Sequence, residues 1–316
     1  MSWIDDLVAR PSAVTIGKFD GVHLGHREIL EDALGMARER GLTPIVVTFD
    51  RHPLATLRPD RAPRLILSPQ QQREALEALG CEVVTIPFDA ETASMDPSEF
   101  VERVLLDGLG ARFVVVGSDF RFGRGGAGDP ALLQRLASAR GVEVHVVDDV
   151  VDDHGARISS TDIRSALAAG DVAAASEQLG RHPRLRGTVV RGHQRGRELG
   201  FPTANLGPDI EGFVPAHGVY AAWATVDAGR FPSAVSIGDN PTFDGLRTTV
   251  EAYLLDVDLD LYHRPIELEL VDHVRDMWRF DGIEPLIAQM HADVVRVREI
   301  LGADDGRAGA PQEETS

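Results

Sequence analysis

The chain of 316 residues is 43% apolar and 26% charged, which is typical of folded globular proteins, and it is long enough for two domains. Its net charge of −18 argues against general nucleic-acid binding. No apolar run approaches the ~18 residues of a membrane span, and the first residues lack the basic start and apolar core of a secretory signal. The single cysteine, Cys81, cannot form an internal disulfide and is expected to be a buried packing residue. We therefore expect a cytoplasmic protein.

Strands and helices are predicted to alternate from residue 13 to about residue 150. The expected strands are nearly all apolar and lie at 13–16, 45–49, 83–87, 113–116 and 142–147. Asp-Pro pairs at 96–97 and 129–130 are typical of helix starts, and glycines at 41, 80 and 141 of helix ends. This α/β pattern predicts a parallel sheet covered by helices on both faces, with any ligand beyond the carboxyl ends of the strands.

The loop at 17–26 follows the first expected strand and leads into an amphipathic helix. His23 and His26 stand three residues apart at the start of that helix, so they lie on the same side of its first turn. Gly25 between them leaves room for a ligand to approach the backbone. The unpaired N–H groups and positive dipole end of the helix favour an anion there, and imidazoles can donate hydrogen bonds to phosphate oxygens.

Two simpler interpretations of this histidine pair are half of a metal site and two ordinary surface histidines. No HExxH pattern or cysteine cluster accompanies the pair, which argues against the metal site. After a strand and a glycine turn, His-Leu-Gly-His resembles the HxGH signature of the nucleotidyltransferase superfamily, and the string GKFDGVHLGH at 17–26 resembles its flavin adenylyltransferase branch. The resemblance implies a Rossmann-like domain with an ATP site that includes Gly17, Phe19, Asp20, His23, Gly25 and His26.

The loop at 117–126 follows the fourth expected strand and falls at the same edge of the sheet. Its glycines permit tight turns near a ligand. Phe120 and Phe122 could flank a flat ring, and Arg121 and Arg124 could reach phosphate. The alternative is that this glycine-rich segment with aromatic residues is only a loop.

The segment at 158–164 precedes a short predicted helix. The hydroxyls of Ser160 and Thr161 could simply cap that helix, or they could bind phosphate together with Arg164, one turn later on the same side. The segment at 48–53 closes the second strand at the same sheet edge. In this order the four strings resemble the amino-terminal module of the prokaryotic bifunctional riboflavin kinase/FAD synthetases. This resemblance implies catalysis by His23, His26 and Arg164, further ATP contacts at Ser160 and Thr161, and flavin contacts at His52, Asp119, Phe120 and Phe122.

The composition changes after about residue 184. Short alternating strands are expected at 185–191, 218–226, 233–237, 248–255 and 266–271, which predicts a small antiparallel barrel or sandwich. A final helix, roughly 284–301, carries an apolar stripe that should pack on this sheet. Residues 303–316 are small and polar and are expected to form a disordered tail.

A glycine-punctuated loop at 192–200 precedes the run Phe-Pro-Thr-Ala-Asn at 201–205. The Thr203 hydroxyl and the Asn205 carbonyl oxygen could join a magnesium shell completed by phosphate oxygens and water. The alternative is a surface turn followed by a strand. The run resembles the flavokinase signature, which implies ATP contacts at Gly192, Gly196, Pro202, Thr203 and Asn205, with Mg²⁺ on the last two.

Downstream strings at 236–243 and 250–253 also resemble that family. A lone glutamate in such a strand is ordinarily just the solvent-facing residue, but by resemblance Glu251 is the base that accepts the proton of the flavin 5′-hydroxyl. Flavin contacts are implied at Asn240, Arg275 and Phe280.

Together these strings predict a bifunctional transferase of flavin biosynthesis with two ATP sites. Residues 184–302 would be a riboflavin kinase domain that makes FMN, and residues 1–183 an FMN adenylyltransferase domain that makes FAD and pyrophosphate. The expected ligands are riboflavin, FMN, ATP and Mg²⁺, with no nucleic acid and no membrane, and self-association is left open. Two rival hypotheses are a nucleotidyltransferase for another phosphate acceptor with a passive barrel, and a flavin-binding sensor without catalysis.

Overall fold

The computed structural model describes residues 3–152, 155–192, 196, 199–242 and 245–308, without side chains at 240–247 and 303–308. It divides into two compact units, Met1–Ser160 and Thr161–Ser316. Among the described residues, no helix is both long and apolar enough to cross a membrane.

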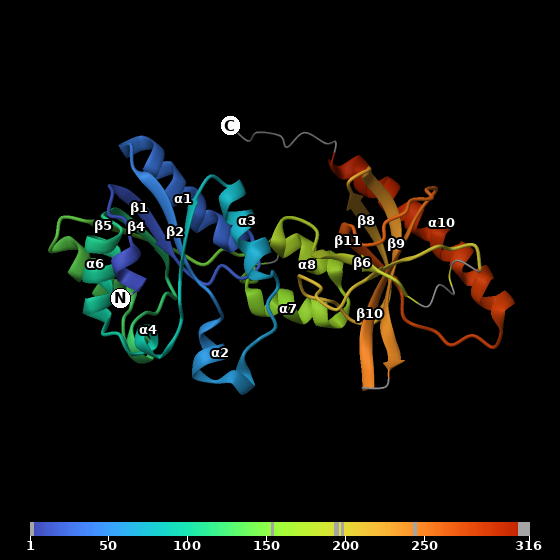
Figure 1. The fold of residues 1–316 in the computed structure, drawn as a ribbon. Helices are drawn as coiled ribbons and strands as arrows, with labels where there is room; N and C mark the ends of the chain where they lie inside the picture. The colour runs from blue at the N-terminus through green and yellow to red at the C-terminus, as the bar shows by residue number, and fades with distance from the viewer. Residues whose placement is uncertain (1–2, 153–154, 193–195, 197–198, 243–244, 309–316) are drawn as a thin grey trace. The chain divides into compact units, whose positions relative to one another are not determined.

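The first unit is built on a five-stranded parallel sheet with the strand order β3-β2-β1-β4-β5 (Figure 1). The strands are β1 Ser12–Ile16, β2 Thr43–Phe49, β3 Glu82–Ile86, β4 Ala111–Gly117 and β5 Glu143–Val147. All five expected strands are present, so the predicted Rossmann-like fold is confirmed. The chain leaves β1 toward β2 and β3 and later returns to β4 on its other side. Ligands of such sheets bind at this change of direction, beyond the carboxyl ends of β1 and β4.

Helices cover both faces of this sheet. The helices of this unit are α1 Leu24–Arg40, α2 Pro53–Leu57, α3 Pro69–Ala78, α4 Ala90–Ser94, α5 Pro97–Glu99 and α6 Pro130–Ser138, with the short helices η1 Trp3–Asp6, η2 Pro59–Arg61 and η4 Arg124–Gly126 and the π-helical η3 Phe100–Gly108. The expected caps are confirmed: the Asp129 carboxylate accepts the Leu132 N–H at 2.8 Å, and Gly41 ends α1 in the left-handed conformation.

Alternation along β1 decides how close α1 comes to the sheet. Val14 and Ile16 pack into the larger core with η3 and α6. Ala13, on the other face, packs with Ala33 and Ala37 of α1. These small side chains let α1 lie close against the strands, which fixes the start of α1 at the carboxyl edge of the sheet. Cys81 is buried as expected, and burial raises the pKa of its thiol to about 11.

The second unit contains a closed antiparallel barrel with the strand order β10-β7-β6-β11-β8-β9. Its elements are α7 Ser160–Ala169, α8 Val172–Leu179, β6 Arg184–Val190, β7 Ala204–Leu206, β8 Gly218–Val226, β9 Gly229–Thr242, β10 Gly245–Leu254, β11 Pro265–Arg275 and α10 Ile283–Ala308. The prediction of a small barrel is confirmed. The short strand β7 is not among the five expected strands, although a strand after a surface turn was the alternative interpretation of the run at 201–205, and it closes the barrel between β6 and β10.

Helix α10 packs on the barrel through Val297 and Leu301, which meet Trp223 and Val271. The expected apolar stripe is therefore a core face. The helix extends to Ala308, whereas a tail was expected from residue 303. The small, polar composition after residue 302 predicted the tail, but the helix continues through the first of these residues. Residues 309–316 lie outside the described residues.

Helices α7 and α8 belong to the barrel unit by contact. The Ala216 N–H donates to the Leu167 carbonyl of α7 at 3.2 Å, and the Leu270 N–H of β11 donates to Pro183 at 2.9 Å. The compact division after Ser160 therefore precedes the functional boundary expected at 183/184, which stays a prediction.

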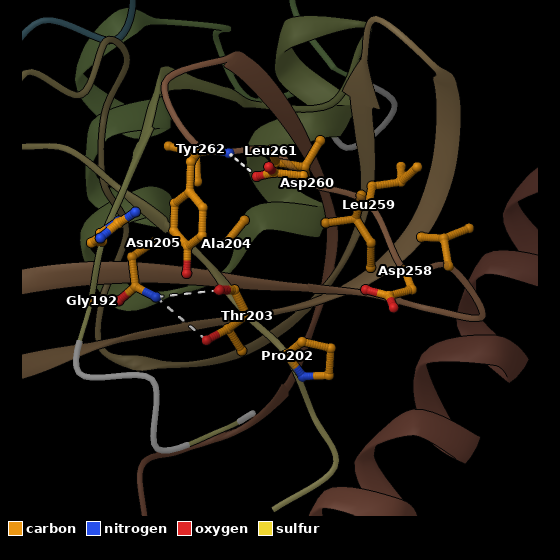
Figure 2. Close-up of a pocket in the computed structure, with 14 residues that line it drawn as sticks. Gly192, Pro202, Thr203, Ala204, Asn205, Asp258, Leu259, Asp260, Leu261 and Tyr262 are labelled. Carbon is orange, nitrogen blue, oxygen red and sulfur yellow. Dashed lines mark hydrogen bonds between the residues drawn. The ribbon is translucent and has the colours of Figure 1, made fainter. Parts of the chain in front are cut away.

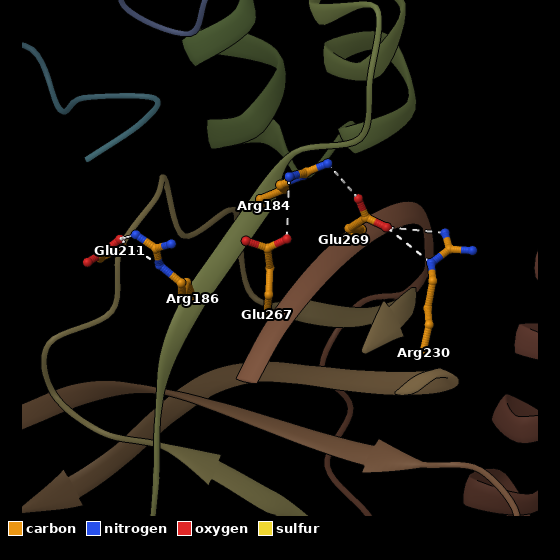
Figure 3. A network of polar contacts seen from close by, with 6 residues as sticks. All are labelled: Arg184, Arg186, Glu211, Arg230, Glu267 and Glu269. Atoms are coloured by element: carbon orange, nitrogen blue, oxygen red, sulfur yellow. Dashed lines mark hydrogen bonds and ion pairs between the residues drawn. The ribbon is translucent and has the colours of Figure 1, made fainter. Parts of the chain in front are cut away.

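Charged side chains cross neighbouring strands on the outside of the barrel (Figure 3). Arg184 of β6 lies between Glu267 and Glu269 of β11, at 3.4 and 2.9 Å, and Glu269 also pairs with Arg230 of β9 at 3.1 Å. Arg186 pairs separately with Glu211 at 2.6 Å. The Glu269 side chain is only 17% exposed, so its carboxylate needs compensating charge, which the guanidinium groups of Arg184 and Arg230 supply.

Candidate active sites

The loop between β1 and α1 places two imidazoles face to face. His23 is the N-cap of α1, and its Nδ1 accepts the His26 N–H at 3.3 Å. An Nδ1 that accepts this bond carries no proton, so the neutral ring has its hydrogen on Nε2, which is then a donor. The two rings stack with centroids 3.6 Å apart, and His23 is 6% exposed. The expected pair is therefore assembled at one helix start, with a donor on His23 Nε2.

Glycine makes this stack fit. A Cβ at Gly25 would lie 3.3 Å from the Cε1 and Nδ1 atoms of the His23 ring, so the ring packs directly over the glycine backbone. Phe19 supports the other ring, with its centroid 5.2 Å from that of His26 in an edge-on contact. The Phe19 ring in turn covers Gly17, where a Cβ would lie 3.1 Å from Phe19 Cε2.

The same loop holds an unusual backbone conformation. Phe19 has φ 45° and Val22 has φ 43°, in the left-handed region that β-branched residues avoid. Burial of both side chains and the bond from the Val22 N–H to the Phe19 carbonyl, 3.0 Å, hold this turn. Such strain costs about 1–3 kcal/mol and occurs mostly where function requires a particular geometry.

Asp20 is a structural anchor within the predicted ATP loop. Its buried carboxylate accepts the Ile66 N–H at 2.9 Å, and its carbonyl accepts the Ser160 hydroxyl at 2.9 Å. Ser160 therefore contacts the histidine loop, at the edge of the sheet where the sequence predicted it to lie. Thr161 and Arg164 lie in the first turn of α7, where Arg164 Nη2 contacts Thr161 Oγ1 at 3.4 Å.

The loop after β4 differs from expectation. Phe120 and Phe122 stack on each other with centroids 5.4 Å apart, whereas a ring between them would need about 7 Å, twice the ~3.5 Å carbon contact distance. Phe122 is also buried in the core beside Phe100. The two rings therefore leave no gap for a flat ring between them, because hydrophobic burial holds Phe122, and the implied flavin contacts of Phe120 and Phe122 stay predictions. Asp119 is paired with Arg157.

A small cavity of about 30 Å³ opens beside the end of β2, lined by Lys18, Asp20, Phe49, Asp50, Arg51, His52, Leu65, Leu67, Pro69 and Gln72. His52 caps α2 through Nδ1, which accepts the Leu54 N–H at 3.1 Å. Partial burial alone would raise the pKa of Asp50, but hydrogen bonds from the Arg51 guanidinium and the Phe88 N–H outweigh it and lower that pKa.

The barrel gathers a second set of polar groups. Thr203 and Asn205 are two residues apart along an extended segment, so they share a face, and Glu251 of β10 is directly opposite Asn205 of β7. The Thr203 hydroxyl donates to Glu251 Oε2 at 3.2 Å, and Asn205 Nδ2 lies 3.4 Å from Thr203 Oγ1. The pair Thr203 and Asn205 thus forms one cluster with Glu251, which is distant in the sequence.

Two glycines border this cluster. A Cβ at Gly192 would lie 2.4–2.7 Å from the side chain of Asn205, and one at Gly196 would lie 2.4 Å from the Phe201 carbonyl. These contacts are closer than a Cβ tolerates, so glycine is required at both positions if the cluster is to keep its geometry. Residues 193–195, 197 and 198 lie outside the described residues.

A cavity of about 340 Å³ opens on the Thr203–Asn205 pair (Figure 2). Its lining is Val189, Arg191, Gly192, Pro202, Thr203, Ala204, Asn205, Leu254, Val257, Asp258, Leu259, Asp260, Leu261 and Tyr262. The Tyr262 ring points toward Asn205 and Thr203 in Figure 2. The wall at 257–262 was missed from the sequence, because no motif marks it and only the fold brings it to Thr203.

The donors of this cluster suit magnesium, which prefers oxygen ligands. The Thr203 hydroxyl and the Asn205 amide oxygen could hold the ion, and Glu251 adds a nearby carboxylate. Within the described part of the chain, no group of three or more His, Cys, Asp or Glu side chains could hold a metal. A magnesium ion here would therefore take its remaining ligands from phosphate oxygens and water.

Arg275 has structural partners. Its Nε and Nη2 bond the Asp293 carboxylate of α10 at 2.8–3.1 Å, and its Nη1 donates to the Asp276 carbonyl at 2.9 Å. The guanidinium also lies 5.0 Å from the Trp278 ring and 5.8 Å from the Phe280 ring. The predicted flavin contacts of Arg275 and Phe280 stay predictions, and the Asn240 side chain lies outside the described residues.

Comparison with known proteins decides the family. The model of the FAD synthetase family matches residues 6–162, and that of riboflavin kinase matches residues 179–301. A bifunctional riboflavin kinase/FMN adenylyltransferase of Escherichia coli (strain K12) is 37% identical over 292 residues, which cover 92% of each chain. The chain belongs to the bifunctional riboflavin kinase/FMN adenylyltransferase family. The resemblance predicted from the sequence is therefore confirmed.

Other relatives agree over most of the chain. The family member from Bacillus subtilis (strain 168) is 35% identical over 89% of this chain and 90% of its own. A solved structure from Streptococcus pneumoniae has a TM-score of 0.86 and 32% identity, over 94% of this chain and 97% of that one. Its title calls it a macrolide-efflux protein, and that name belongs to that protein.

Proposed function

We propose that this chain carries both activities of its family, with the kinase on the barrel and the adenylyltransferase on the parallel sheet. The observation that supports the kinase is the Thr203–Asn205–Glu251 cluster, whose Thr203 and Asn205 line a cavity of about 340 Å³. The observation that supports the adenylyltransferase is the stacked His23–His26 pair at the start of α1. The functional domains are 1–183 and 184–302.

In the kinase reaction, the γ-phosphoryl group passes from ATP to the 5′-oxygen of riboflavin, which gives FMN and ADP. Glu251 accepts the proton that the 5′-hydroxyl loses as the new P–O bond forms. Thr203 and Asn205 hold Mg²⁺, which when bound neutralises charge on the phosphates. Positioning and charge stabilisation supply most of the rate in such transfers.

In the adenylyl transfer, a phosphate oxygen of FMN attacks the α-phosphorus of ATP, and the bond to the β-phosphate oxygen breaks to release pyrophosphate. The nucleophile is already an anion, so this site needs no base. His23 Nε2–H and the His26 ring donate hydrogen bonds to the phosphates and stabilise the charge that grows on the leaving group. The family resemblance adds Ser160, Thr161 and Arg164 to the triphosphate contacts.

The test is a chromatographic time course of purified protein with riboflavin, ATP and Mg²⁺, in which FMN should precede FAD. Asn205→Ala should stop FMN formation but still convert supplied FMN to FAD. His26→Ala should slow FAD formation on the order of 10²–10³-fold and spare FMN formation. His145→Ala, an exposed histidine of β5, is the matched control.

The outcomes separate the rival functions. FMN without FAD would mean that the histidine module acts on another phosphate acceptor. Flavin binding without any turnover would mean a sensor. Full FAD formation by His26→Ala would remove the adenylyltransferase assignment.

A further inference from the structure

The cavity above Thr203 and Asn205 has an unusual balance of charge for a polyphosphate site. Two carboxylates, Asp258 and Asp260, line it, and Arg191 is the one cation among the described residues of its lining. ATP carries several negative charges, so two carboxylates near it are unfavourable unless cations compensate them. Bound magnesium supplies part of that compensation. Arg191 is placed to supply another part.

The fold brings Arg191 next to the phosphate end of the cavity. In the β6–β7 pairing, Val190 is directly opposite Asn205, and Arg191 is the next residue after Val190. Gly192 follows and packs against the Asn205 side chain. Arg191 therefore leaves the barrel immediately beside the residue that is proposed to hold magnesium, and its side chain lines the same cavity.

Tyr262 gives the arginine a fixed place. The Arg191 guanidinium lies over the Tyr262 ring, 5.5 Å from its centroid, in a cation–π arrangement. Among the described residues, Arg191 has no ion-pair partner, although Asp258 and Asp260 line the same cavity. Within the described part of the chain its charge is thus not taken up by an ion pair, while the Tyr262 ring restricts its orientation. A planar guanidinium in this state suits the recognition of phosphate oxygens.

We propose that Arg191 binds the phosphates of ATP at the kinase site and that Tyr262 positions it there. This inference rests on the proposed kinase function of the barrel. Arg191 is a substrate-binding residue, and Tyr262 is a positioning residue that acts through it. The alternative is that Arg191 is an exposed cation that only stacks on a tyrosine.

The test measures kinase KM values for ATP and riboflavin and inhibition by inorganic tripolyphosphate, which has the phosphates without the nucleoside. For Arg191→Ala we expect the KM for ATP to rise roughly 10- to 100-fold, the range for hydrogen bonds to charged groups, with the KM for riboflavin unchanged. Inhibition by tripolyphosphate should weaken by a similar factor. Arg191→Lys keeps the charge but loses the planar fork, so it should restore part of the affinity.

Variants of Tyr262 test the positioning role. Tyr262→Phe keeps the ring and should behave as the wild type, whereas Tyr262→Leu should raise the KM for ATP about two- to five-fold, the loss of a cation–π contact at an exposed site. Arg264→Ala is the matched control, since Arg264 is two residues away, is exposed and pairs with Asp227 at 3.7 Å. Urea unfolding followed by circular dichroism checks that the barrel of each variant is folded, since FAD formation reports only on the parallel-sheet unit.

Three results would overturn the inference. They are an unchanged KM for ATP in Arg191→Ala, a rise in the KM for riboflavin alone, and unchanged inhibition by tripolyphosphate. If the wild-type protein has no kinase activity, the proposed function fails instead. An active wild type with an unaffected Arg191→Ala would leave the kinase assignment in place and refute only the role of Arg191.

Discussion

The buried ion pair between Arg275 and Asp293 allows a quantitative prediction. The Arg275 and Asp293 side chains are only 11% and 7% exposed, and Gln289 also donates to the carboxylate at 2.8 Å. Asp293→Ala would leave the guanidinium largely buried without its counterion. Removal of one partner from a buried pair costs about 3–5 kcal/mol. Because Arg275 keeps its bond to the Asp276 carbonyl and its contact with Trp278, we expect the lower end, about 3 kcal/mol of barrel stability.

The same substitution should act on the kinase. Arg275 connects α10 to the segment after β11, through the Asp276 carbonyl and the rings of Trp278 and Phe280. Loss of its anchor at Asp293 frees that segment, which is predicted to contact the flavin. We expect a higher KM for riboflavin and an unchanged KM for ATP. Urea unfolding followed by circular dichroism gives the stability, and FAD formation from supplied FMN is the internal control.

The control variant removes both charges. Arg275→Met combined with Asp293→Leu should recover most of the lost stability, because no uncompensated charge stays buried. If Asp293→Ala unfolds at the same urea concentration as the wild type, the pair contributes nothing and the reasoning fails. A double variant as unstable as the single one would equally contradict the charge argument, since packing alone would then explain the loss.

Three further substitutions test other contacts. Gly192→Ala should abolish FMN formation and spare FAD formation in the chromatographic assay, because its Cβ would lie 2.4–2.7 Å from the Asn205 side chain. Glu269→Ala should lower barrel stability by about 1 kcal/mol in urea, since it removes two partly exposed ion pairs. His263→Gly should stabilise the barrel by about 0.5–1 kcal/mol and so raise its melting temperature. Residue 263 has φ 61°, which glycine adopts without strain, in a turn closed by the bond from the Arg264 N–H to the Leu261 carbonyl.

The helix caps, the strands of the sheet and the histidine pair could be predicted from the sequence, because each depends on residues that are close together in the chain. Asp-Pro pairs and terminal glycines mark helix boundaries because a cap needs only a few neighbouring residues, and the caps at Asp96 and Asp129 are present. Apolar runs gave the five strands of the sheet for the same reason, since a strand buried on both faces requires them. The histidine pair was predicted because helix geometry alone places residues 23 and 26 together.

Features that depend on tertiary packing were not predictable. Phe122 belongs to the core, which depends on its contact with Phe100 of a separate helix. Arg275 was expected at the flavin, but its partner Asp293 appears in sequence as one more polar residue of a helix. The 257–262 wall has no motif at all. In each case the decisive contact joins segments that the sequence does not connect.

In the proposed assignment, the two sites bind the same nucleotide with different chemistry because their nucleophiles differ. FMN brings an anionic phosphate, so the histidine loop must supply donors and keep carboxylates away from the phosphates. Its one acid, Asp20, is accordingly buried and bonded to the Ile66 N–H. Riboflavin brings a neutral hydroxyl that must lose a proton, so the barrel needs a carboxylate beside the phosphates, and Glu251 lies at hydrogen-bonding distance from Thr203. A carboxylate there repels ATP, which is a physical reason for cations in the kinase cavity.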